Sequence, residues 1–127
     1  LAISAAKLGY VPVEAFDFDR EAVRVARENA RQNGIARAVR IARRDLTKIS
    51  RSSRRCYDVV CANLIFDLLI AERSRVLSRV KPGGVLVLAG ILATQFERVV
   101  AAYAERGMRL VATRTEKEWQ SGSFVRD

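Results

Sequence analysis

The stretch Val11–Asn29, VPVEAFDFDREAVRVAREN, constrains the fold most, because it predicts a short strand that ends in an acid and passes at once into a helix. Residues 12–16 are apolar apart from one glutamate, as expected for a buried strand. Asp19 suits a helix N-cap, small apolar residues follow at helical spacing, and Gly34 suits the end of the helix. A strand, an acid and a helix in this order indicate an alternating α/β fold.

Asp17 is the first candidate functional residue, because it follows the last residue of the predicted strand. An ionised carboxylate offers only hydrogen-bond acceptors, which suits the two hydroxyls of a ribose in nucleotide-binding α/β folds. The alternative is that Asp17 and Asp19 are only turn and cap residues. The pattern of strand, acid and helix alone leaves both interpretations open.

The chain has 127 residues, of which 50% are hydrophobic, so it has the size of one domain with an ordinary core. No run approaches the roughly 20 apolar residues of a membrane span, which predicts a soluble, cytoplasmic protein. Cys56 and Cys61 are the only cysteines and the chain has no histidine. We expect reduced thiols in or near the core, and no metal site.

The formal charge of +9 is unevenly distributed, since one segment holds many cations and only one acid, Asp45. Its basic residues are Arg37, Arg40, Arg43, Arg44, Lys48, Arg51, Arg54 and Arg55. The loop Arg43–Arg55 is therefore either a contact surface for RNA or a merely solvated loop.

The rest of the chain alternates between strands and helices. The first helix should end at Gly9. The further strands that we expect are Val39–Ala42, Tyr57–Ala62, Val85–Ala89, Arg109–Thr113 and Trp119–Val125. We also expect a helix Leu64–Val80 that ends at the turn KPGG, and a helix that begins with a capping box at Thr94–Glu97 and ends at Gly107. The connection between the last two strands is too short for a crossover helix, so they should be antiparallel. The predicted fold is α/β, a doubly wound, mostly parallel sheet with a C-terminal antiparallel hairpin. We assign Trp119 to the packing of that hairpin.

Six segments follow one another along the chain: AAKLGY, DFDREAV, ENARQNG, YDVVCANLIFDLL, KPGGVLVLAGIL and EKEW. In this order they resemble segments of the PrmA-type ribosomal protein methyltransferases, which are class I, Rossmann-like, S-adenosylmethionine-dependent enzymes. The succession of ANL and AGIL favours this family over other methyltransferases. The resemblance implies transfer of methyl groups from S-adenosylmethionine to amino groups of a large-subunit ribosomal protein.

The same resemblance implies roles for five residues. Asp17 would accept hydrogen bonds from the cofactor ribose, and Phe18 would pack on the adenine face. Asp45 would lie near the adenine amino group, with Leu46 beside the ring. Asn63 would stand at the point of methyl transfer and orient a neutral amine toward the methyl group. From the residues alone, the alternative roles are a strand-end cap for the next helix at Asn63, an ion-pair partner for arginines at Asp45, and an ordinary core residue at Phe18.

Phe18 and Arg20 replace the isoleucine and proline that are commoner in the family. The family's glycine-rich loop and first strand would immediately precede Leu1, so we expect the chain to be a fragment whose upstream strand and N-terminal substrate-recognition domain lie outside it. The alternatives are a methyltransferase for RNA or another protein, and a non-catalytic methyltransferase-like domain that binds RNA or a partner. An NAD-dependent enzyme shares the acid at Asp17, but the terminal hairpin and Asn63 fit it less well.

Overall fold

The computed structural model describes residues 1–126. They form two compact units, Leu1–Ile49 and the part of the chain from Ser50 onward. That all 127 residues belong to one methyltransferase domain stays a prediction. No helix in the described residues is long and apolar enough to span a membrane.

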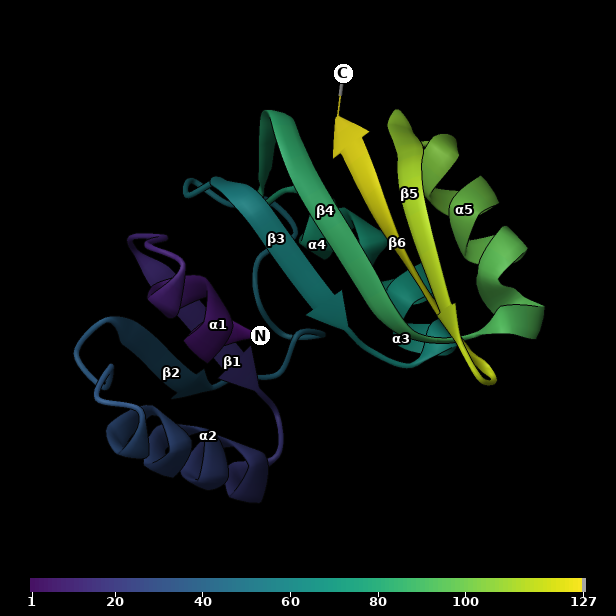
Figure 1. The fold of residues 1–127 in the computed structure, drawn as a ribbon. Helices are drawn as coiled ribbons and strands as arrows, with labels where there is room; N and C mark the ends of the chain where they lie inside the picture. The colour runs from purple at the N-terminus through teal and green to yellow at the C-terminus, as the bar shows by residue number, and fades with distance from the viewer. Residues whose placement is uncertain (127) are drawn as a thin grey trace. The chain divides into compact units, whose positions relative to one another are not determined.

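The first unit contains α1 (Ala2–Lys7), β1 (Val13–Asp17), α2 (Arg20–Gln32) and β2 (Val39–Arg43), with the two strands parallel (Figure 1). The predicted helix ends are confirmed, because Gly9 and Gly34 follow the helices with φ of +90° and +70°. Asp19 is the N-cap of α2 and accepts a hydrogen bond from the Glu21 N–H at 2.9 Å. The predicted order of strand, acid and helix is therefore confirmed. The predicted burial of the strand is wrong, because only Val13 of β1 is buried and Phe16 is 40% exposed.

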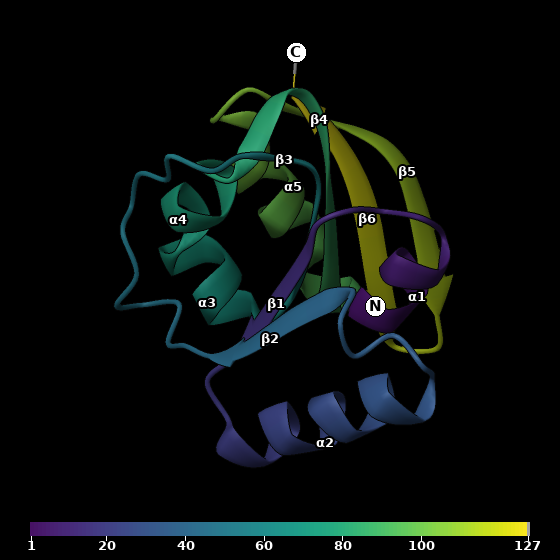
Figure 2. The ribbon, with the colours of Figure 1, turned by 90° about the vertical axis from the view of Figure 1, so that its left-hand side faces the viewer.

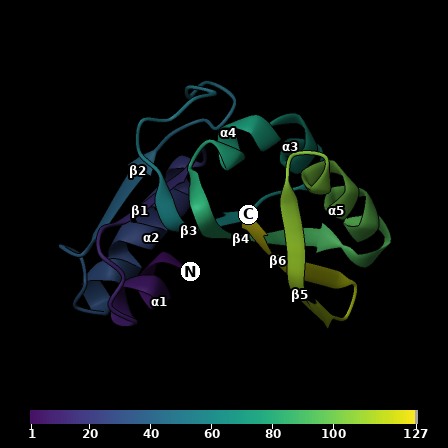
Figure 3. The same cartoon turned by 90° about the horizontal axis from the view of Figure 1, so that it is seen from above.

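The second unit is a four-stranded sheet in the order β3-β4-β6-β5. Its elements are β3 (Tyr57–Asn63), α3 (Phe66–Ala71), α4 (Arg73–Leu77), β4 (Val80–Leu92), the 3₁₀ turn η1 (Ala93–Gln95), α5 (Phe96–Ala104), β5 (Met108–Glu116) and β6 (Trp119–Arg126). β3 and β4 are parallel, whereas β6 is antiparallel to both β4 and β5, as predicted for the terminal hairpin. All three α-helices of this unit lie on one face of its sheet (Figures 2 and 3).

The core of the second unit lies between that sheet and its helices. Leu86 and Leu88 of β4 and Phe124 of β6 are completely buried. Tyr103 of α5 is buried with them, and its hydroxyl donates to the Leu69 carbonyl of α3 at 2.9 Å. This hydrogen bond connects α5 to α3 within the core.

The predicted single helix Leu64–Val80 is wrong, because the segment forms two short helices with Glu72 between them. Glu72 leaves helical geometry at φ −103° and ψ 13°, and its carboxylate pairs with the Arg75 guanidinium. The KPGG segment is also no simple turn. It forms a bulge within β4, where the register jumps from Val80 to Val85 and Gly83 has φ +73°.

Two smaller predictions fail. In the described residues no side chain caps the start of α5, because the chain enters it through η1, so the capping box is wrong. Cys56 and Cys61 are exposed rather than in the core. Side chains alternate along β3, so Cys61 faces the side of the sheet opposite to the buried Ala62.

Trp119 lies opposite Leu92 and Glu116 but stays 49% exposed, so the hairpin covers only part of its side chain.

Candidate functional site

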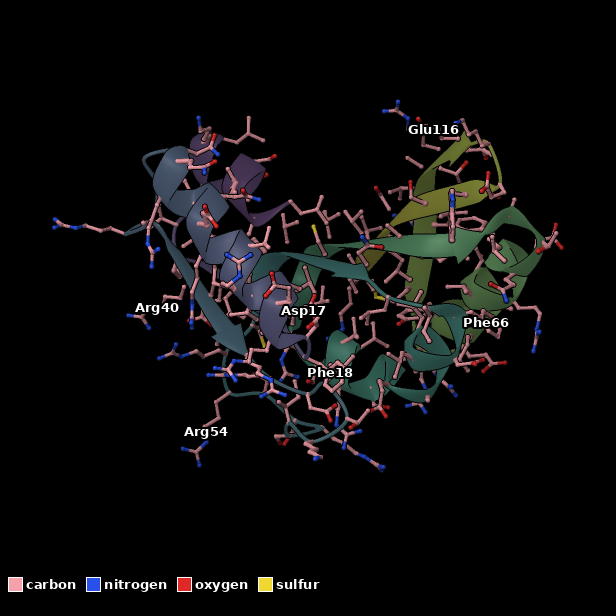
Figure 4. All side chains as sticks on the ribbon, turned by 90° about the horizontal axis from the view of Figure 1, so that it is seen from below. Asp17, Phe18, Arg40, Arg54, Phe66 and Glu116 are labelled. Carbon is pink, nitrogen blue, oxygen red and sulfur yellow. The ribbon has the colours of Figure 1, made fainter. Side chains whose placement is uncertain are left out.

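The carboxyl ends of β1 and β2 form one edge that carries four of the five candidate residues. Asp17 is paired with Arg43 in the parallel register, and the Arg44 N–H donates to the Asp17 carbonyl at 3.0 Å. Both strands therefore stop together. Asp17 is the last residue of β1 and Phe18 follows it (Figure 4), whereas Asp45 and Leu46 follow β2.

Asp17 is exposed, and the start of α2 fixes its orientation. Oδ1 accepts a hydrogen bond from the Asp19 N–H at 2.9 Å. Within residues 1–126, the second carboxylate oxygen accepts none. An oriented carboxylate with open acceptor positions fits the hydroxyl groups of a ribose.

Phe18 exposes 66% of its surface, which excludes its interpretation as a core residue. Its carbonyl accepts a hydrogen bond from the Arg43 Nε at 3.1 Å, so the backbone that carries the ring is fixed to the end of β2. An exposed aromatic ring on a fixed backbone suits the face of a planar ligand such as adenine.

Asp45 and Leu46 are partly buried in the turn after β2. The Asp45 Oδ1 accepts hydrogen bonds from the Thr47 N–H at 2.9 Å and the Thr47 hydroxyl at 2.7 Å. Asp45 thus stabilises this turn, a role that the sequence analysis did not assign to it. A contact of Asp45 or Leu46 with adenine stays a prediction.

Asn63 is the last residue of β3, is exposed, and pairs in register with Ala89 of β4. Helix α3 takes Ile65 as its N-cap without a side-chain hydrogen bond, so Asn63 is not its cap. Among the described residues no group hydrogen-bonds the Asn63 side-chain amide, which leaves that amide open to a ligand. Asn63 belongs to the second unit, and its assembly with Asp17 into one site stays a prediction.

A cationic groove of about 670 Å³ in the first unit was not predicted. Arg20, Arg24, Arg27 and Arg31 line it from α2, and Arg43 lines it from the end of β2. Acidic residues neutralise Arg24, because its guanidinium pairs with Glu21 at 2.6 Å and Glu28 at 3.1 Å and lowers the pKa of Glu21. The arginines follow the 3.6-residue period of a helix, a signal present in the sequence.

Comparison with known proteins decides the family. The sequence model described as ribosomal protein L11 methyltransferase (PrmA) matches residues 1–127. The chain belongs to this family. The ribosomal protein L11 methyltransferases of Chelativorans sp. and Rhizobium rhizogenes are 39% and 40% identical to it over 120 residues, which are 94% of this chain and 41% of theirs. The chain thus spans about two fifths of the length of these curated relatives.

Similarity to solved structures agrees with this family assignment. A ribosomal protein L11 methylase from Lactobacillus delbrueckii subsp. bulgaricus superposes with a TM-score of 0.87 at 25% identity, over 98% of this chain and 63% of that one. An RNA methyltransferase from Salinibacter ruber, solved with S-adenosyl-L-homocysteine, shares the fold at a TM-score of 0.69 and 18% identity, over 98% and 71% of the two chains. The predicted class I methyltransferase fold is confirmed.

Proposed function

We propose that the protein containing this chain is an S-adenosylmethionine-dependent N-methyltransferase that modifies amino groups of ribosomal protein L11. The observation that carries the proposal is the exposed Asn63 amide, which no group in residues 1–126 engages, at the end of a strand in a chain of this family. The open carboxylate of Asp17 and the exposed ring of Phe18 support a nucleoside cofactor. The proposed substrate places the reaction in the cytoplasm.

The proposed mechanism is chiefly positioning. S-adenosylmethionine supplies an electrophilic methyl group when bound. Asp17 would accept hydrogen bonds from its ribose, and Phe18 would cover its adenine. The Asn63 Oδ1 accepts a hydrogen bond from the neutral substrate amine and aims its lone pair at the methyl group. The chain has no histidine, and the amine loses its proton to water before it attacks.

Substitution of Asn63 tests the proposal in the full-length protein. We expect Asn63→Ala to abolish methylation of L11 while the affinity for S-adenosylhomocysteine, measured by titration calorimetry, stays the same. Normal turnover by the variant would remove Asn63 from the site. A folded wild-type protein that binds no S-adenosylhomocysteine would favour the non-catalytic alternative.

A second candidate function is contact with RNA, and the cationic groove favours it. Arg27 and Arg43 are oriented there by backbone carbonyls, which leave their charge unneutralised. Arg40 and Arg54 are exposed on β2 and in the following loop (Figure 4). Guanidinium groups bind phosphate oxygens, and such binding weakens as the salt concentration rises.

Salt dependence tests the RNA contact. We expect Arg20→Ala combined with Arg31→Ala to weaken the binding of a labelled RNA hairpin, measured by anisotropy, and to reduce the slope of log K against log salt by about 1 for each phosphate that is no longer bound. Arg114→Ala is the matched control, because Arg114 is an exposed arginine of the second unit. Equal binding by all variants would reject the groove as an RNA site.

A further inference from the structure

Gly90 lies beside Asn63 at a bulge in β4. Asn63 pairs with Ala89, the residue before Gly90, and the Leu64 N–H donates to the Ala89 carbonyl at 3.2 Å. On its other side, β4 advances from Leu88 to Ile91 while β6 passes only from Gly122 to Gln120, so β4 holds one extra residue there. Such bulges re-aim the backbone at the end of a ladder.

The backbone of Gly90 leaves no room for a side chain. A Cβ atom at this position would lie 2.7 Å from the Asn63 Oδ1 and 2.9 Å from the Leu64 carbonyl oxygen. Both distances are shorter than the van der Waals separation of carbon and oxygen. Gly90 also has φ +78°, a conformation that residues with a side chain rarely adopt. Two hydrogen-bond acceptors therefore occupy the space that a side chain at residue 90 would fill.

We propose that Gly90 is a positioning residue for methyl transfer, because the absence of a Cβ leaves room for the Asn63 amide and the Leu64 carbonyl to lie where they receive the substrate amine. This inference rests on the proposed function of Asn63. An amine N–H offers donors to both oxygens, so their separation sets the direction of the nitrogen lone pair. A methyl group on Gly90 displaces one or both oxygens. A displacement of this kind, about 1 Å, costs on the order of 100-fold in rate.

Gly83 provides a matched control on the same strand. It has φ +73°, close to that of Gly90, but a Cβ there would meet no atom within 4 Å. It lies in the bulge beside the start of β3, whereas Asn63 ends that strand. Gly83→Ala therefore imposes the same backbone strain as Gly90→Ala without the collision.

The experiment compares Gly90→Ala, Gly83→Ala, Asn63→Ala and the double variant Asn63→Ala/Gly90→Ala in the full-length protein. We expect Gly90→Ala to lower kcat about 100-fold while KM for the substrate and Kd for S-adenosylhomocysteine change less than about twofold. Gly83→Ala should keep the wild-type kcat. In the Asn63→Ala background, the Gly90 substitution should lower the residual kcat less than it does in the wild type, because one of the two oxygens that it displaces is already absent.

Each outcome decides something. If Asn63→Ala turns over normally, the proposed role of Asn63 fails and the Gly90 inference fails with it. If Asn63→Ala is inactive but Gly90→Ala matches Gly83→Ala in kcat, only the Gly90 inference fails. If Gly90→Ala does not fold, equilibrium unfolding of the double variant decides. Recovery of folding once Oδ1 is removed supports the contact with Asn63. Continued failure to fold would assign the collision to the Leu64 carbonyl and overturn the positioning of Asn63 by Gly90.

Discussion

Asp17 and Asp19 have different roles although they are two positions apart. The Asp19 carboxylate caps α2, whereas Asp17 accepts the Asp19 N–H with one oxygen and keeps the other open. The sequence alone indicates these different roles, because Asp17 ends a predicted strand whereas Asp19 begins a predicted helix. The contact between Gly90 and Asn63 had no such local signal, since it depends on the register of two strands and on a bulge.

Substitutions at the two acids should have opposite consequences. We expect Asp17→Ala to weaken S-adenosylhomocysteine binding by about 1–3 kcal/mol, the cost of leaving ribose hydroxyls without acceptors. Asp19→Ala should instead lower the free energy of unfolding by about 1 kcal/mol through loss of the N-cap. Calorimetric titration and urea unfolding of the full-length protein measure both. Loss of affinity in Asp19→Ala alone would contradict the assignment.

Tyr103 should make stability depend on alkaline pH. Burial raises the pKa of its hydroxyl well above the usual value near 10. Above pH 10 the unfolded chain loses this proton while the folded chain keeps it, so the free energy of unfolding falls by up to about 1.4 kcal/mol per pH unit. Below pH 10 the contribution is constant.

The variant Tyr103→Phe isolates this effect. At pH 7 it should be less stable by about 0.5–1.5 kcal/mol, because the Leu69 carbonyl loses its donor. Above pH 10 its stability should fall less steeply than that of the wild type, as measured by urea unfolding at each pH. Tyr10→Phe is the control, because Tyr10 is 49% exposed. Parallel pH profiles for wild type and Tyr103→Phe would rule out a titrating Tyr103.

At the scale of elements, the sequence predicted strands better than helix boundaries. The apolar spacing of residues 64–80 continues through the break at Glu72, because α3 and α4 bury Leu69 and Leu77 toward the same core. The glycines of KPGG are compatible with a turn and with a bulge. The pairing of β4 with β3 on both sides of this segment shows that it is a bulge. β6 was placed correctly because its alternation matches its burial, with Gly122 and Phe124 facing inward.

Gly122 shows how closely β6 packs on α5. A Cβ atom there would lie 2.8 Å from the Phe96 Cζ, and 3.0 Å from the Leu110 Cδ1. We expect Gly122→Ala to lower the free energy of unfolding by about 1–3 kcal/mol through overpacking. Ser121→Ala on the same strand is the control and should change stability by less than about 0.5 kcal/mol. Urea unfolding measures both, and equal stability of the two variants would show that α5 can move aside.

At the scale of the whole molecule, the order of elements was enough to predict the fold class, because an alternating α/β chain with a terminal hairpin has few solutions. The division into two units follows from which strands pair. Within residues 1–126, β1 pairs only with β2, and β3 pairs only with β4. The motifs predicted the family correctly, yet four candidate residues lie in one unit and Asn63 in the other.

The two units should differ in local stability. Only four of the seventeen buried hydrophobic side chains in the described residues belong to the first unit, namely Val13, Val23, Ala30 and Val39. A small core offsets little of the conformational entropy lost on folding, so β1 and β2 should open more often than β4 and β6. We expect the free energy of opening to be lower by on the order of 3 kcal/mol in the first unit. Amide hydrogen exchange of the 127-residue chain measures it. Equal protection of Ala15 in β1 and Val87 in β4 would mean instead that both units open in one cooperative transition.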